Sequence, residues 1–324
     1  MTSARSLSRV ACVAWLAFAP LLAACGEPNA SSSSHWLTCG TNLDCANFPG
    51  AAICGGDGFC EGADGHKIVQ GLVFEDNFDE GPLDAQSFAY ETGYSIRNND
   101  AEDYTSRASN VFIDNGELVL QANAEVMGQA QYTSGSIDTQ GLKSFTYGRI
   151  AARMLVPDGT GVGPALWMLP ESPGAYVNVC DDTGKCVVSG YPAWGDIVIM
   201  TIRSEHREQV LHTSSYATWD ATKMEYVRGQ GGGTETLPES AGAAYHEYAV
   251  EWGPQRIDWL TDGVVQHSFD TTAADILHPS GENPFSKPFN IRLSLAVGGL
   301  SEAPDPSVYP QQMRVDWLRV WQYQ

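Results

Sequence analysis

The chain has 324 residues, which is long enough for one large domain or for a domain with appendages. Its 33 Gly and 17 Pro residues, with many Thr, Val, Tyr and Trp residues, favour strands and turns over helix bundles. The 18 basic and 39 acidic residues give a formal net charge of −21, which argues against nucleic acid or another polyanion as the main partner.

Residues 1–24 have the features of a targeting segment. Two arginines precede an apolar run that is too short to span a membrane as a helix. The run ends in L-A-A-C at 22–25, which resembles the lipobox of bacterial lipoproteins. On this resemblance Cys25 is the lipidated first residue of the mature chain, and Gly26 after it indicates sorting to the outer membrane. We therefore expect an exported protein, lipid-anchored at the outer membrane or cell surface of a diderm bacterium. Cleavage as an ordinary secretory signal is the alternative.

A Ser-rich tether over 25–38 leads into a cysteine-rich segment over 39–62. Four cysteines within 22 residues indicate a small two-disulfide module, for which three connectivities are possible. The spacings C-x5-C and C-x8-C fit zinc poorly. A further pair of cysteines, at 180 and 186, would close a short loop that contains a D-D-T-G turn. We expect all six to be structural cysteines: Cys39, Cys45, Cys54, Cys60, Cys180 and Cys186.

The main domain, expected over 69–324, consists of short alternating segments separated by turns. The stretch W-L-T-D-G-V-V places a D-G turn between apolar strands, which is a hairpin signal. No segment shows sustained helical periodicity or a strand–helix–strand rhythm. The pattern predicts an all-β sandwich. Strands are expected within 115–122, 147–157, 246–252 and 256–269.

Several segments of this domain, in order along the chain, resemble family-16 glycoside hydrolases of the laminarinase-like branch, which cleave β-1,3-glucans. The resemblance implies a concanavalin-like jelly-roll sandwich with a long groove across one sheet. The matching segments are Y-T-S-G-S-I-D-T (132–139), F-T-Y-G-R-I-A-A-R (145–153), G-P-A-L-W-M-L-P (163–170), Y-H-E-Y-A-V-E-W (245–252), F-N-I-R-L-S-L-A-V-G-G (289–299) and P-Q-Q-M-R-V-D-W-L-R-V-W-Q (310–322).

The family resemblance also implies where catalytic groups belong. Retaining hydrolysis needs two carboxyl groups ~5–5.5 Å apart. The family carries them on one strand as E-x-D-x-x-E, with a bulge that keeps all three side chains on one face. Aligned on G-D-I-V-I-M-T, the nucleophile position is Asp196, the orienting position is Val198 and the acid/base position is Thr201.

All three positions differ from the family pattern. Asp196 is one methylene shorter than Glu, and Val198 cannot form a hydrogen bond. Thr201 cannot protonate a departing sugar oxygen, and general acid catalysis is typically worth ~10²–10⁴ in rate. The sequence therefore predicts lost or very weak hydrolysis. An enzyme that uses Asp196 with a relocated acid such as Asp220 is the alternative, whereas Glu205 lies ~13 Å further along an extended strand than Thr201.

Sugar rings stack on aromatic side chains, and polar groups satisfy their hydroxyls. Core packing is the alternative role for each aromatic residue. The candidate substrate-binding residues are Trp167, Tyr191, Trp194, Trp219, Arg97, Asn98, Asn99 and His212.

No cofactor is expected to be required. Family members often bind a structural calcium ion, for which Asp316 matches a usual ligand and Asn77 replaces a Glu. We expect a lipid-anchored monomer that recognises neutral β-1,3-glucan-type polysaccharide and no nucleic acid. A scaffold whose partner is a protein is the second alternative.

Overall fold

The computed structural model describes residues 34–36, 39, 41–45, 53–56, 60–62 and 69–323, apart from 80, 96, 172–177, 181–185, 189–192, 221, 223–224, 274–275 and 277–282. All of them belong to the second of two compact units, Ser33–Gln324.

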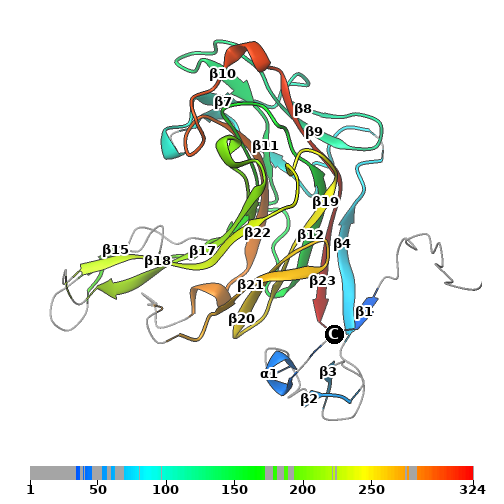
Figure 1. Cartoon of the computed structure of the whole chain (residues 1–324), viewed down its shortest axis with the longest axis vertical. Helices are drawn as coiled ribbons and strands as arrows, with labels where there is room; N and C mark the ends of the chain where they lie inside the picture. The colour runs from blue at the N-terminus through cyan, green and yellow to red at the C-terminus, as the bar shows by residue number, and fades with distance from the viewer. Residues whose placement is uncertain are drawn as a thin grey trace, which may run out of the picture. The chain divides into compact units, whose positions relative to one another are not determined.

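Two large antiparallel sheets form the main body of this unit (Figure 1). The nine-stranded sheet runs in the order β1-β4-β23-β12-β19-β20-β21, with β9 beside β23 and β8 beside β9. Its strands are β1 (Ser34–Trp36), β4 (Val69–Asp76), β8 (Val111–Ile113), β9 (Leu118–Ala122), β12 (Gly148–Leu155), β19 (His246–Trp252), β20 (Arg256–Thr261), β21 (Val264–Asp270) and β23 (Gln311–Tyr323).

The seven-stranded sheet runs in the order β18-β17-β16-β13-β22-β11-β5. It carries the strand for which the sequence predicts the functional residues. Its strands are β5 (Ala89–Tyr90), β11 (Ser136–Asp138), β13 (Val162–Pro170), β16 (Ile197–Thr201), β17 (Gln209–Asp220), β18 (Glu225–Thr236) and β22 (Phe289–Val297).

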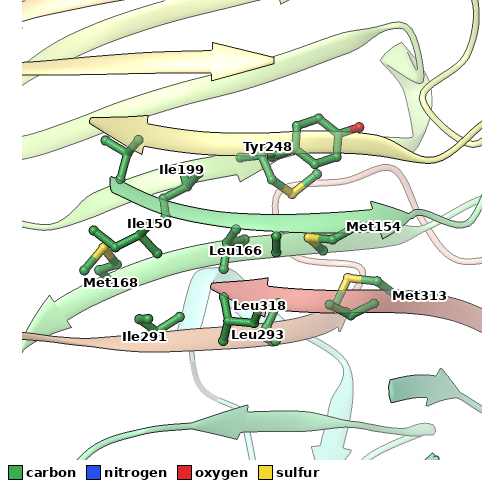
Figure 2. Close-up of a cluster of buried hydrophobic side chains, with 14 of the residues drawn as sticks. Ile150, Met154, Leu166, Met168, Ile199, Tyr248, Ile291, Leu293, Met313 and Leu318 are labelled. Atoms are coloured by element: carbon green, nitrogen blue, oxygen red, sulfur yellow. The ribbon is translucent and has the colours of Figure 1, made fainter. Parts of the chain in front are cut away.

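Alternating side chains explain why the two sheets stack. Along β13 every second residue is buried, so that Leu166 and Met168 reach the core while Ala165 and Trp167 point the other way. Side chains of both sheets meet in one cluster of buried residues (Figure 2), which includes Ile150 from β12. The prediction of an all-β jelly-roll sandwich is confirmed.

Smaller elements complete the unit. Among the described residues of the main domain, they are a three-stranded sheet, a hairpin and four 3-10 helices. The sheet consists of β6 (Gly93–Tyr94), β7 (Glu102–Tyr104) and β10 (Tyr132–Ser134), and the hairpin consists of β14 (Asn178–Cys180) and β15 (Cys186–Val188). The 3-10 helices are η1 (Arg97–Asn99), η2 (Ser204–His206), η3 (Pro284–Ser286) and η4 (Pro306–Val308). None of the helices in the described part of the chain is long and apolar enough to cross a membrane.

The cysteine-rich segment forms two disulfides, Cys39–Cys54 and Cys45–Cys60. Cys45, the last residue of α1 (Asn42–Cys45), is joined to β3 (Cys60–Glu61), and Cys39, which precedes α1, is joined to β2 (Ile53–Cys54) of the same hairpin. Of the three connectivities that the sequence allows, the structure has the one in which the first cysteine bonds to the third and the second cysteine bonds to the fourth. For the other predicted pair, the strand register sets Cys180 opposite Cys186, but their side chains lie outside the described residues.

Candidate functional site on the seven-stranded sheet

A β-bulge interrupts β16 in the middle of the seven-stranded sheet. Against β13, Trp167 is opposite Val198 and Leu166 is opposite Met200, so that Ile199 is an extra residue. Against β17 the register also shifts between Val198 and Thr201. A bulge of this kind reverses the alternation of side chains beyond it.

The bulge sets the side chains of the three predicted catalytic positions on one face. Ile199 and Met200 are both fully buried in the core, although they are consecutive. Val198 and Thr201, on either side of them, are half-buried and point away from the core. We call this side of the seven-stranded sheet, which points away from the core, the open face. Without the extra residue, Thr201 would point into the core.

Asp196 lies directly before β16 and is almost completely covered. Its side chain is 4% exposed. Its Oδ1 accepts a hydrogen bond of 2.6 Å from the backbone N–H of Ser215, and its own N–H donates to the Ser215 carbonyl at 3.2 Å. The carboxylate therefore fastens the start of β16 to β17. A covered, hydrogen-bonded carboxylate is a poorer nucleophile than one that faces an open site.

Strand register aligns two rows of side chains across the open face. The first row contains Trp167 and two charged residues, whereas the second is made of small or neutral side chains. The first row is Thr213, Val198, Trp167, Arg292 and Asp138, and the second is Leu211, Thr201, Ala165, Ser294 and Ser136.

Trp167 is held in place by neighbours on β22. Its Nε1–H donates to Ser294 Oγ at 3.1 Å, and the Arg292 guanidinium carbon lies 5.4 Å from the ring centroid. Arg292 is itself fixed, because it donates to Asn290 and Gln140. The half-buried indole is thus a preorganised aromatic platform beside Val198.

Two further polar groups border the position of Asp196. Arg228, an exposed residue of β18, donates through Nε and Nη2 to Ser215 Oγ at 3.0 and 2.7 Å. Arg228, Ser215 and Arg292 were not predicted from the sequence as site residues. The alternation in F-N-I-R-L-S-L-A-V could have placed Arg292 on the open face, but the partners of Ser215 follow only from the register of three strands.

Three other carboxylates in the described part of the chain, Asp220, Asp138 and Glu205, are too far from Asp196 to form a catalytic pair with it. Asp220 is five residues beyond Ser215 on β17, ~16 Å at the usual rise per residue. Asp138 lies on the third strand from β16, ~14 Å away at the usual strand spacing. Glu205 follows the opposite end of β16, where its Oε2 accepts from Glu302 N–H. Inverting hydrolysis needs carboxyl groups within about 9.5 Å, and retaining hydrolysis needs a shorter separation.

The structure does not bring His212 to the open face. The ring is fully buried, and its Nδ1 lies 2.6 Å from the Ile199 carbonyl oxygen on the core side. Thr213 and Ser215 face the open side instead, because alternate residues of β17 point to opposite sides. The prediction of a sugar contact for His212 did not take this alternation into account.

The remaining predicted binding residues lie at the borders of the open face or outside the described residues. Trp194 is half-buried in the turn before β16. Asn98 and Asn99 are exposed in a loop next to Gly299, which follows β22. Tyr191 and the side chains of Trp219 and Arg97 lie outside the described residues, as does Cys25.

The described residues near Asp316 do not fit a calcium site. Asp316 Oδ2 is 2.5 Å from Arg153 Nη1, and Asn77 Oδ1 accepts from Arg319 Nη2 at 2.9 Å. The oxygens that the family resemblance suggests as calcium ligands are thus bonded to two guanidinium groups. Calcium takes 6–8 oxygen ligands. Within the described part of the chain, the sole group of three potential His, Cys, Asp or Glu ligands is formed by disulfide-bonded cysteines.

Two stacked antiparallel sheets, one with a bulged central strand and an aromatic platform on its open face, define a jelly-roll protein. The chain belongs to family 16 of the glycosyl hydrolases. The family model matches residues 206–319. A β-glucanase of Rhodothermus marinus is 30% identical over 264 residues, which are 78% of this chain and 85% of that protein.

Other relatives agree with this assignment. The glucan endo-1,3-beta-glucosidase A1 of Niallia circulans is 32% identical over 281 residues, although the chain spans 38% of that protein's length. The solved structure of the Rhodothermus marinus laminarinase matches with a TM-score of 0.67 at 28% identity, over 79% of this chain and 99% of that one.

Proposed function

We propose that this protein binds β-1,3-glucan-type polysaccharide on the open face of the seven-stranded sheet and does not hydrolyse it by the two-carboxyl mechanism of its family. The observation that carries the proposal is the state of the three site positions. They hold a covered Asp196 bound to Ser215 N–H, an apolar Val198 and a Thr201 that cannot serve as an acid near neutral pH.

The binding half of the proposal rests on what the open face retains. Trp167 is fixed by Ser294 and Arg292, so a sugar ring can stack on it with little loss of side-chain entropy. The side chains of Ala165, Ser294 and Thr201 in the neighbouring row are small. Neutral glucan fits this surface because the charges of Arg292 and Asp138 balance one another. Arg292 Nη1 lies 3.5 Å from Asp138 Oδ2.

The test combines glucan binding with a hydrolysis assay on the mature chain. We expect laminarin to retard the protein in affinity electrophoresis, while reducing-sugar release stays at the level of an Asp196→Ala variant. Trp167→Ala should weaken binding by about 1–3 kcal/mol, the usual contribution of a buried aromatic surface.

Trp317→Ala is the matched control. Trp317 is also half-buried and also has an arginine over its ring, with Arg319 Cζ 4.5 Å from the centroid, but it lies on the nine-stranded sheet. This control should leave laminarin binding unchanged. Hydrolysis that Asp196→Ala abolishes would show an active enzyme with a recruited acid. Absence of both binding and hydrolysis would support the protein scaffold.

A further inference from the structure

Two carbonyl oxygens of the β16 bulge accept hydrogen bonds from side chains in the core of the sandwich. Trp259 Nε1–H donates to the Val198 carbonyl oxygen at 3.0 Å, and His212 Nδ1 lies 2.6 Å from the Ile199 carbonyl oxygen. Both side chains are 0% exposed. Because a carbonyl oxygen accepts only, Nδ1 of the imidazole carries a proton in this contact.

These contacts occur where the sheet ladder is irregular. Between the pairs Val198–Thr213 and Thr201–Leu211, two residues of β16 face one residue of β17, and that one residue is His212. A bulged residue loses part of its regular ladder bonding, and an unbonded buried carbonyl is costly. The side chain of His212 thus supplies a donor to the extra residue, Ile199.

The two donors come from different elements of the sandwich. His212 belongs to β17, the neighbour of β16 in the same sheet, whereas Trp259 belongs to β20 and reaches across the core from the other sheet. Glu235 Oε2 lies 3.4 Å from His212 Nε2 and fixes the ring from its far side. Burial opposes ionisation of Glu235, but the contact with His212 keeps its pKa below the ordinary value.

We propose that Trp259 and His212 are positioning residues that set the bulge of β16 from the core side and thereby hold Asp196, Val198 and Thr201 on the open face. The consequence for glucan recognition rests on the proposed function. Neither residue touches the open face, so each acts on the ligand only through the backbone of β16. Loss of either donor frees a bulge carbonyl and lets the strand sample a register in which Thr201 turns inward.

The experiment compares two tryptophan variants that lose equivalent hydrogen bonds. Trp259→Phe removes the donor to Val198. Trp252→Phe removes a donor to the Phe285 carbonyl at 2.9 Å from an equally buried indole on the adjacent strand β19. Both should lower the Tm by a similar amount. Trp259→Phe alone should speed amide hydrogen exchange in peptides covering 195–203 and weaken laminarin binding, each by about tenfold, which corresponds to one lost buried hydrogen bond of ~1.4 kcal/mol.

Two variants of His212 test the second donor, and they replace the tryptophan comparison if Trp259→Phe does not fold. His212→Leu removes the donor to Ile199, and His212→Gln restores an N–H at similar reach. We expect fast exchange and weak binding in the first variant and recovery of both in the second. Equal changes in Trp252→Phe and Trp259→Phe, or no recovery with glutamine, overturn the proposal. If the wild-type chain binds no laminarin, the proposed function fails, and the exchange measurement still decides the role of the bulge.

Discussion

Glu102 is a carboxyl group with no exposed surface, buried beside the loop that carries Asn98 and Asn99. Its Oε2 accepts from Val297 N–H at 3.0 Å. Burial, and next the nearby charge of Asp100, raise its pKa from 4.5 to about 7. The folded chain therefore holds a proton between about pH 4.5 and pH 7 that the unfolded chain releases. Across this window the free energy of unfolding falls as the pH rises, and above it the effect is constant.

Glu102→Gln should remove this dependence. The difference in unfolding free energy between wild type and variant is expected to change by about 3 kcal/mol from pH 4 to pH 8, in favour of the variant at high pH. Urea unfolding at several pH values measures it, with the exposed Glu239→Gln as control. A difference that stays constant with pH would mean that Glu102 titrates normally in the folded chain.

The arginine contacts of Asp316 and Asn77 make a second prediction about single residues. Bound calcium at about 100 times its dissociation constant stabilises a folded protein by about 2.7 kcal/mol, which is several degrees in Tm. Because Arg153 and Arg319 engage these oxygens, we expect the same Tm in calcium and in a chelator. Differential scanning fluorimetry is the measurement, and a calcium-dependent rise of several degrees contradicts the prediction.

Individual elements differ in how much of them the sequence predicts. The alternation in β13 assigns Trp167 to the open face, and the alternation in β22 places Asn290 and Arg292 on one face. What the residues do on that face depends on which strands are neighbours and in what register. Sequence alternation carries no register between distant strands, so the pairing of Asp196 with Ser215 could not be predicted. The prediction of a sugar contact for His212 failed for a different reason, since the alternation of side chains within β17 was not considered.

The bulge of β16 supports a prediction about the whole strand. Since it already orients all three site positions alike, Asp196→Glu, Val198→Asp and Thr201→Glu together should produce laminarin hydrolysis above the wild-type background. Single substitutions should do little, because nucleophile and acid act as a unit and their effects are not additive. Reducing-sugar release is the measurement. Chemical unfolding serves as a control, since the change adds charge to the sheet. A folded, glucan-binding triple variant without turnover would show that the strand alone does not supply the catalytic geometry.

At the scale of the whole molecule, two predictions succeeded: the all-β sandwich and the cysteine-rich module that precedes it. Both depend on patterns within short stretches of sequence. Alternation predicts strands, and closely spaced cysteines predict disulfides. The connectivity Cys39–Cys54 and Cys45–Cys60 required the structure, since spacing allows three choices. The boundaries of the signal, tether and module at residues 24, 38 and 62 stay predictions.

The predicted anchoring of the molecule depends on Cys25, which lies outside the described residues. We predict that it is the acylated first residue of the mature chain and that Cys25→Ser releases the protein from the membrane fraction. A single acyl chain binds a membrane only marginally, so stable attachment needs the several chains of a lipoprotein. Cys180→Ser is the control, since it removes a cysteine of the main domain and leaves the lipobox intact. Mass spectrometry of membrane-extracted protein should find an acylated Cys25. An unmodified terminus elsewhere in the mature chain would show that the segment is an ordinary secretory signal.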